Sequence, residues 1–235
     1  MRRDDPNREY LLVVADAIGD LCNEVVFVGG SVAGLLLTDP IADGIRATKD
    51  VDAVVEATTL SQYHQMEKRL SVSGFKRDAS SEVICRWRHT GTGVLFDLMP
   101  TDPAVLGFSN RWYPEAMKTA TRVRLNERIE IRLISGPAFV ATKLEAFMSR
   151  GGGDILSSHD LEDILNVVDG RPSIVEELCT ASEPLQKFVR ENFRALMLRS
   201  DLENYLPGLL TDENRTGIVL SRLRAMAAHH QGSGA

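Results

Sequence analysis

Cysteine is scarce in this sequence. Its 235 residues include three cysteines, Cys22, Cys85 and Cys179, which lie far apart along the chain. An odd number of widely spaced cysteines predicts reduced thiols and excludes a disulfide scaffold. The five histidines do not have zinc-ligand spacing with these cysteines, so we expect no zinc centre.

Long apolar stretches are also lacking. No segment comes near the roughly 20 consecutive apolar residues of a membrane-spanning helix, so we expect no membrane contact. The first ten residues, MRRDDPNREY, are charged and contain no signal-peptide core. We therefore expect a cytoplasmic protein. A content of 43% hydrophobic and 26% charged residues is ordinary for a globular chain with a large core.

The chain has no excess of positive charge. A net charge of -6 argues against non-specific binding of duplex nucleic acid, because neutralised phosphates supply much of that affinity. Binding of RNA at a local basic patch stays open. Two sets of basic residues are candidates for such a patch: Arg122, Arg124, Arg128 and Arg132, and Lys187, Arg190, Arg194 and Arg199.

What the sequence does contain is an apolar strand that ends in two glycines. The run Val25 to Val28 predicts a strand buried on both faces, and Gly29, Gly30 and Ser31 follow it. Glycine lets the backbone come close to a ligand, and the start of a helix attracts anions. The run therefore predicts a cradle for phosphate groups. Because the lysine of a P-loop and the glycine pattern of a dinucleotide site are both missing, neither of those sites is predicted.

Three aspartates stand on two later predicted strands. Asp50 and Asp52 lie two residues apart in one strand, so their carboxylates share a face. Such carboxylates repel each other unless a cation lies between them, and Mg²⁺ binds carboxylates together with phosphate oxygens. Asp97 is an isolated acid in the apolar run VLFDLMP and is the third predicted ligand. We therefore expect Mg²⁺ or Mn²⁺ at these three side chains.

A buried lysine is predicted in a helix from Pro137 to Arg150. Lys143 lies four residues from both Phe139 and Phe147, at the centre of an apolar stripe. A lysine is almost never fully buried unless it is paired. Lys143 should therefore reach a carboxylate or a bound phosphate. The alternatives are a lysine that extends out of a core helix to solvent and one that pairs with a structural acid.

Asp160 has two interpretations. Ser157 and Asp160 have the spacing of a capping box at the start of a helix, where acidic side chains favour the positive end of the dipole. Asp160 can equally be an active-site acid that orients Lys143 or a nucleotide. Asp163, three residues further on, is the weaker candidate for that role.

These motifs resemble the polymerase-beta-type nucleotidyltransferase superfamily in its minimal, non-polymerase branch. The resemblance lies in the Gly-Gly-Ser turn, the Asp-x-Asp strand and the later strand with a single aspartate. The run from Arg46 through Thr48 to Asp52, and KLEAFMSRGGGDILSSHDLEDI at residues 143–164, are similar to AbiEii-type toxin nucleotidyltransferases. The resemblance covers roughly residues 20–170, and the segment between Ser31 and Asp50 is longer than in many members.

The resemblance implies transfer of a nucleotide from a nucleoside triphosphate to an acceptor hydroxyl, with release of pyrophosphate. Metal binding would fall to Asp50, Asp52 and Asp97, of which Asp97 would also take the acceptor's proton. The remaining site residues would act on the nucleotide: Gly29, Gly30, Ser31, Arg46, Thr48 and Lys143 in binding its phosphates, and Asp160 as a further active-site acid.

The expected acceptor is RNA, such as tRNA, or a protein, and the toxin resemblance implies an antitoxin partner. Two alternatives stay open. One is a small-molecule nucleotidyltransferase of the antibiotic-modifying type, which would need an acidic acceptor pocket. The other is a catalytically silent nucleotide-binding module.

The periodicities predict an α+β chain in two parts, with a mixed sheet at residues 1–136 and a helical domain at 137–228; the resemblance implies that the first part is a nucleotidyltransferase core. Helices are expected at 8–21 and 61–70, and hairpins at 83–99 and 122–134. Beyond Pro137 only helices are predicted, broken near 151–154, 170–172, 183–184 and 207–208. The last residues, 229–235, predict a disordered tail.

Overall fold

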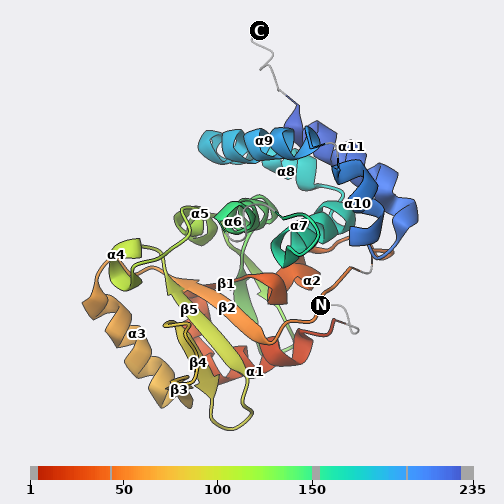
Figure 1. The fold of residues 1–235 in the computed structure, drawn as a ribbon. Coiled ribbons are helices and arrows are strands. Elements are labelled where there is room, and N and C mark those ends of the chain that lie inside the picture. Colours follow the sequence, from red (N-terminus) through yellow and green to blue (C-terminus); the bar gives the residue numbers. More distant parts are fainter. Residues whose placement is uncertain (1–4, 43, 150–153, 200, 229–235) are drawn as a thin grey trace.

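The fold is α+β with a mixed sheet, as the sequence predicts (Figure 1). The structure, a computed structural model, describes residues 5–42, 44–149, 154–199 and 201–228. The predicted tail at 229–235, Arg150 and the glycine run at 151–153 lie outside these described residues.

Seven strands form one sheet in the described chain, in the order β3-β4-β5-β2-β1-β7-β6. Strand β2 runs parallel to β5 and β1 runs parallel to β7, while the other neighbours are antiparallel. The strands are β1 (Val25–Val28), β2 (Asp50–Val55), β3 (Phe75–Arg77), β4 (Arg86–His89), β5 (Leu95–Pro100), β6 (Thr121–Arg124) and β7 (Glu130–Leu133). Both predicted hairpins are present, as β4–β5 and β6–β7, whereas β3 was not predicted.

Strand β1 lies in the interior of the sheet and is buried along its whole length. Its neighbour β2 is polar on one face and apolar on the other, because Asp50 and Asp52 alternate with the fully buried Val51 and Ala53. The apolar face of β2 joins the core. The polar face is left for the site described below.

The N-terminal part contributes short helices around the sheet. They are α1 (Arg8–Ile18), α2 (Ala33–Leu36), α3 (Leu60–Val72), α4 (Pro103–Leu106) and α5 (Tyr113–Thr119), with 3-10 turns at Gly19–Asn23 and Gly30–Val32. Thr59 begins α3 with a capping box in which its hydroxyl accepts from the backbone of Gln62. Helices α4 and α5 were not predicted.

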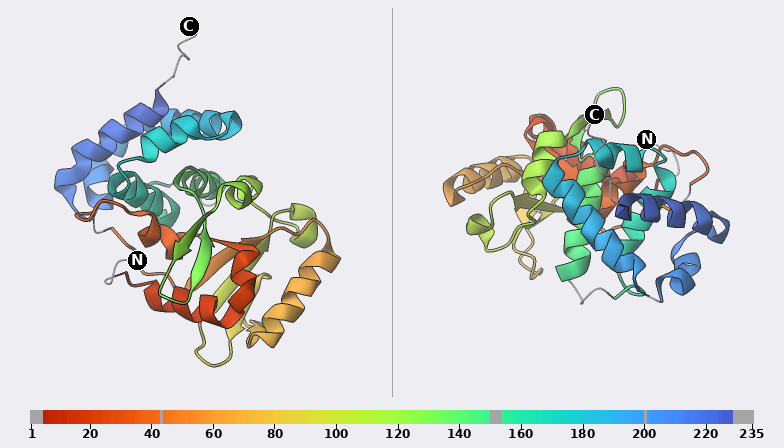
Figure 2. Two further views of the ribbon diagram at one scale, coloured as in Figure 1. Left: turned by 180° about the vertical axis from the view of Figure 1, so that it is seen from behind. Right: turned by 90° about the horizontal axis from the view of Figure 1, so that it is seen from above.

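From residue 136 onward the described chain is helical, as predicted. Its helices are α6 (Gly136–Ser149), α7 (His159–Gly170), α8 (Ile174–Thr180), α9 (Glu183–Met197), α10 (Leu202–Leu209) and α11 (Thr216–Ala227), with a 3-10 turn at Glu213–Arg215. Figures 1 and 2 show these helices gathered on one side of the sheet, with α6 and α7 nearest to it. None of the helices in the described residues has both the length and the apolar character needed to cross a bilayer.

Two local predictions were wrong. Helix α1 ends at Ile18 instead of near Leu21, because Gly19 adopts φ +53° and the chain continues as a 3-10 turn. The buried face of α1 consists of Leu11, Val14, Ala15 and Ile18. The predicted break at 207–208 lies inside α10, which contains Pro207 in its last turns.

The two parts are joined by hydrogen bonds to the segment after α2. The backbone N–H groups of Thr38 and Asp39 both donate to the carbonyl of Gly170, at 2.8 and 2.9 Å. Arg215 joins Asp39 to Asp169 through ion pairs of 2.7 Å each. These contacts fix α7 against the sheet side of the molecule and so set the position of the residues at its N-terminal end.

Candidate active site

Three aspartates from the sheet line one open cleft. Asp52 is paired with Asp97 in the register of the parallel strands β2 and β5, and Asp50 lies two residues earlier on the same face. The cleft has a volume of about 820 Å³, and helices α6 and α7 form its opposite side. The structure therefore brings together the three side chains that the sequence predicts as metal ligands.

Arg86 on β4 lies between two of these aspartates. Its Nη2 atom donates to Asp50 Oδ2 at 2.6 Å and to Asp97 Oδ2 at 2.7 Å, and its Nε donates to Asp97 Oδ1 at 2.8 Å. The hydrogen bonds to Asp97 raise the pKa of Arg86 above its usual value, against the opposing effect of burial. Sequence reasoning missed Arg86, although the predicted hairpin could have placed it opposite Asp97, its partner in the register.

The predicted glycine turn lies beside the aspartates. Gly29 has φ +74°, and a Cβ atom there would overlap the carboxylate of Asp52. A Cβ atom at Gly30 would lie 2.9 Å from both Arg46 Nη2 and Asp163 Oδ2. Both glycines are required because charged side chains approach their backbone closely.

Ser31 is not placed as the sequence predicts. Its side chain is fully buried, it does not line the cleft, and its hydroxyl has no hydrogen-bond partner within the described chain. The helix after the turn, α2, is only four residues long. An extended helix dipole is therefore not available to bind phosphate at this turn.

Lys143 on α6 forms ion pairs across to α7. Its Nζ atom donates to Asp163 Oδ2 at 2.7 Å and to Asp160 Oδ1 at 2.9 Å, and its side chain is 12% exposed. Burial lowers the pKa of Lys143, but the charges of Asp163 and Asp160 outweigh burial and raise it above its usual value. The lysine lines the cleft and is paired with carboxylates, one of the partners that the sequence predicts.

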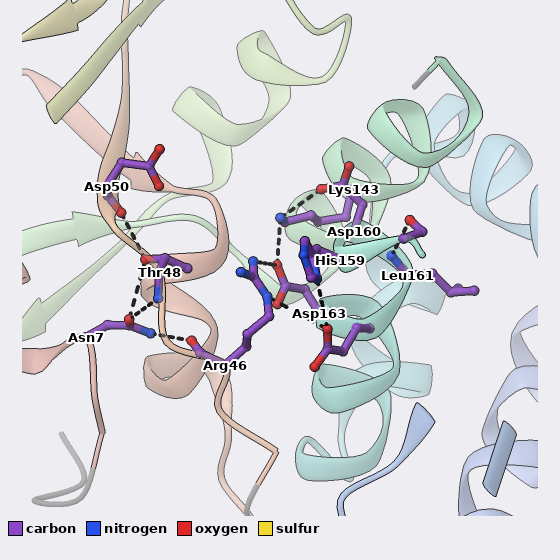
Figure 3. A network of polar contacts seen from close by, with 11 residues as sticks. Asn7, Arg46, Thr48, Asp50, Lys143, His159, Asp160, Leu161 and Asp163 are labelled. Atoms are coloured by element: carbon purple, nitrogen blue, oxygen red, sulfur yellow. Dashed lines mark hydrogen bonds and ion pairs between the residues drawn. The ribbon is translucent and has the colours of Figure 1, made fainter. Parts of the chain in front are cut away.

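Asp163 is the centre of this network (Figure 3). Its Oδ2 atom accepts from Lys143 and also from Arg46 Nη2 at 3.2 Å, and its side chain is 1% exposed. Asp163 therefore joins α6, α7 and the segment before β2, although the sequence favoured Asp160 over Asp163 as the active-site acid. Asp160, 14% exposed, reaches the same lysine and lines the cleft.

The capping-box interpretation of Asp160 was wrong. The N-cap of α7 is Ser158, whose hydroxyl accepts from the backbone N–H of Leu161 at 3.2 Å. Ser157, the predicted cap, donates instead to Asp154 Oδ2 at 2.7 Å. Because Asp160 lies one position closer to the cap than the capping box requires, its carboxylate is directed to Lys143.

Thr48 supports the start of β2. Its backbone N–H donates to Asn7 Oδ1 at 2.8 Å, and its hydroxyl donates to the carbonyl of Asp50 at 3.0 Å. Asn7 also donates to the carbonyl of Arg46 at 2.9 Å (Figure 3). Thr48 and Arg46 both line the cleft, while their backbone is held by Asn7, which sequence reasoning missed.

Carboxylates outnumber cations along the cleft. The acids that line it are Asp50, Asp52, Asp97, Asp154 and Asp160, and the cations are Arg46, Lys49, Arg86 and Lys143. Three of these cations are paired with carboxylates, whereas Lys49 has no carboxylate partner within the described chain. An anionic ligand therefore needs additional positive charge to bind here.

The sheet aspartates fit a divalent cation in donor type and in placement on one face. In the described residues, no group of three or more His, Cys, Asp or Glu side chains is arranged to hold a metal ion directly. On the sheet face, the guanidinium of Arg86 lies between Asp50 and Asp97.

Comparison with known proteins gives no close relative. No protein-family model matches the chain, and neither does any curated protein at a significant level. Two crystal structures from Helicobacter pylori are similar, JHP933 and a candidate nucleotidyltransferase, each with a TM-score of 0.47 and 11% identity. They cover 97% and 98% of this chain, which covers 93% and 100% of theirs. Similarity at this level does not assign the chain to a family.

Proposed function

We propose that the cleft transfers a nucleotidyl group from a nucleoside triphosphate to an acceptor hydroxyl, in the manner of the polymerase-beta-type superfamily. One observation carries this proposal. Asp50, Asp52 and Asp97 line the same cleft as Lys143, beside a turn whose glycines let charged side chains approach the backbone closely. Carboxylates for divalent ions on one side, with a cation for phosphate on the other, are the parts that such a transfer needs.

The roles follow from position. Asp50, Asp52 and Asp97 would hold Mg²⁺ or Mn²⁺, and such an ion, when bound, neutralises phosphate oxygens and activates the hydroxyl that attacks. Asp97, whose side chain is 8% exposed, would accept the proton of the acceptor hydroxyl. Lys143 would face the triphosphate, oriented by Asp160 and Asp163.

The contacts on the helix side support the finer assignment to an AbiEii-type branch. The two segments that carry this resemblance, Arg46 to Asp52 and Lys143 to Ile164, meet through the ion pairs of Arg46 with Asp163 and Glu162. We therefore propose an RNA, such as tRNA, or a protein as acceptor, with an antitoxin as partner. The second candidate basic patch, Lys187, Arg190, Arg194 and Arg199, gives this acceptor little support, because Lys187 lies 4.0 Å from Glu191 and Arg199 pairs with Asp201.

A cationic small molecule is the second candidate acceptor. The surplus of carboxylates along the cleft is what a cationic acceptor would need, and Asp154 adds to it on the helix side. Hydrogen bonds from Ser157 and Leu156 lower the pKa of Asp154, so this carboxylate stays charged.

The test is transfer of label from each of the four α-³²P nucleoside triphosphates, with Mg²⁺ or Mn²⁺, to fractionated cellular RNA, protein and metabolites. Labelled RNA or protein supports the first acceptor class, and labelled small molecules support the second. Asp50→Ala and Asp97→Ala should each lower transfer by at least about 10³-fold without unfolding the protein. Asp78→Ala is the matched control, because Asp78 pairs with Arg88 away from the cleft. No label in any fraction would refute the proposal and favour a catalytically silent nucleotide-binding module.

A further inference from the structure

Arg86 uses both oxygens of Asp97. Its Nε and Nη2 atoms form two parallel hydrogen bonds to this carboxylate, at 2.8 and 2.7 Å, and Nη2 also reaches Asp50 Oδ2 at 2.6 Å. Bidentate bonds of this kind are among the stronger polar interactions in proteins. Each oxygen of Asp97 therefore keeps one lone pair, and a cation bound there would lie directly beside the guanidinium.

The sheet fixes this arrangement. Arg86 is the register partner of Asp97 on β4, and Asp97 is the register partner of Asp52 on β2. The side chain of Arg86 is 19% exposed, so little water screens its charge. Arg88, two residues further along β4, is 48% exposed and pairs with Asp78 outside the cleft. Only the first of these two arginines bears on the aspartates.

We propose that Arg86 is a built-in counter-ion that competes with a divalent cation for Asp50 and Asp97. This inference rests on the proposed function, which places Mg²⁺ or Mn²⁺ at the same carboxylates. A guanidinium and a divalent ion repel each other at such short range, and both are drawn to the same two carboxylates.

Two consequences follow from this competition. The carboxylates bind the ion more weakly than they would without Arg86, because the guanidinium must first leave. The backbone of Arg86 keeps its place when the ion binds, because β4 is held between β3 and β5, so only the side chain has to move. Without the ion, Arg86 keeps Asp50 and Asp97 close together and offsets their mutual repulsion.

The test measures Mn²⁺ binding by electron paramagnetic resonance, without nucleotide, so that it does not depend on transfer activity. Arg86→Met removes the charge and keeps most of the apolar stem. We expect it to bind Mn²⁺ at least about tenfold more tightly than the unaltered protein. In EDTA the variant should melt at a lower temperature, and Mn²⁺ should raise its melting temperature more than that of the unaltered protein. Arg88→Met, the control, should change neither quantity.

Arg86→Lys guards against a variant that does not fold. Its single ammonium cannot bond to both oxygens of Asp97 as the planar guanidinium does, so Mn²⁺ binding should again tighten. Equal or weaker Mn²⁺ binding in folded Arg86 variants would overturn the inference, as would the absence of Mn²⁺ binding in every form. If transfer occurs while these variants bind Mn²⁺ no more tightly, the inference fails and the proposed function stands. If the variants bind Mn²⁺ more tightly but no form of the protein transfers a nucleotide, the inference stands and the proposed function fails.

Discussion

The two sides of the cleft differ in how they balance charge. On the sheet side, Asp50 and Asp97 pair with Arg86, and Asp52 lies on the same face; we call these four residues the sheet wall. On the helix side, Asp160 and Asp163 are matched by Lys143 and Arg46; we call these four the helix wall. The sheet wall carries surplus negative charge, whereas the helix wall is neutral within itself.

This difference assigns different tasks to the two walls. A surplus of carboxylates in a cleft is costly unless a cation offsets it, and the divalent ion proposed above would do so at the sheet wall. The helix wall holds its charges together and ties three segments to each other, with Lys143 left at the surface of the cleft. Chemistry is therefore expected to depend most on the sheet wall, and stability on the helix wall.

The largest expected effect is a difference in transfer activity between a sheet-wall variant and a helix-wall variant. Asp52→Asn should lower nucleotidyl transfer by at least about 10³-fold, because it removes a predicted metal ligand. Asp160→Asn should lower it by about tenfold, because Lys143 keeps its second partner, Asp163. Initial rates with labelled triphosphate measure both. A loss of equal size in the two variants would end the division of tasks between the walls.

The next effect is on stability. Asp163→Asn leaves Lys143 and Arg46 without the carboxylate that they share, and breaking such a buried pair costs about 3 kcal/mol. Urea denaturation followed by circular dichroism measures this loss. Glu203→Gln, which breaks an exposed pair with Arg224, should leave the midpoint nearly unchanged. If both variants unfold at the same urea concentration, the helix wall does not have the stabilising role given to it here.

A smaller effect concerns the turn beside the sheet wall. Gly29→Ala should lower transfer by about 100-fold, because the new Cβ atom displaces the carboxylate of Asp52. Gly107→Ala is the matched control, since Gly107 has φ +81° but nothing within 4 Å of its Cβ position. Both variants should lose about 1 kcal/mol of stability from the positive φ. Unchanged transfer in Gly29→Ala would show that Asp52 need not keep this position.

The smallest effect is a pH dependence on the sheet side. Burial raises the pKa of Cys85 from 9.0 to about 12, and the charges of Asp97 and Asp52 add to the shift. Above pH 9 the unfolded chain releases the thiol proton while the folded chain keeps it, so the contribution of Cys85 to stability falls as pH rises. The difference in unfolding free energy between the unaltered protein and Cys85→Ala should change by about 1 kcal/mol between pH 9 and 10, to the disadvantage of the unaltered protein. Cys179→Ala, at an exposed position on α8, should show no such change.

The main elements could be predicted because their signals are local. The apolar run of β1, the alternation in β2 and the helical spacing around Lys143 each depend on residues close in sequence. The stripe on α6 also predicted that Lys143 needs an anion. The short length of the helix after Gly29 was not predicted. Helix α2 ends at Leu36, and the backbone N–H groups of Thr38 and Asp39 then donate to Gly170 at the end of α7, a contact between residues far apart in sequence.

The partners within the site could not be ranked from the sequence. Asp160 and Asp163 are equally acidic and lie on one helix, but only the packing of α7 against α6 makes Asp163 the shared acceptor. Ser31 looked like a phosphate ligand, yet its side chain turned into the interior. Both outcomes depend on how segments pack, which local patterns do not specify.

By itself, the sequence determined the kinds of elements and the common face of Asp50 and Asp52, because strand geometry alone makes alternate side chains point the same way. Tertiary structure decided that Arg86 lies between Asp50 and Asp97, 36 and 11 residues away, and that Arg46 meets Asp163 across 117 residues. Charges so far apart in sequence become neighbours only when strand register and helix packing place them in the same low-dielectric cleft, where their attraction is strong enough to matter.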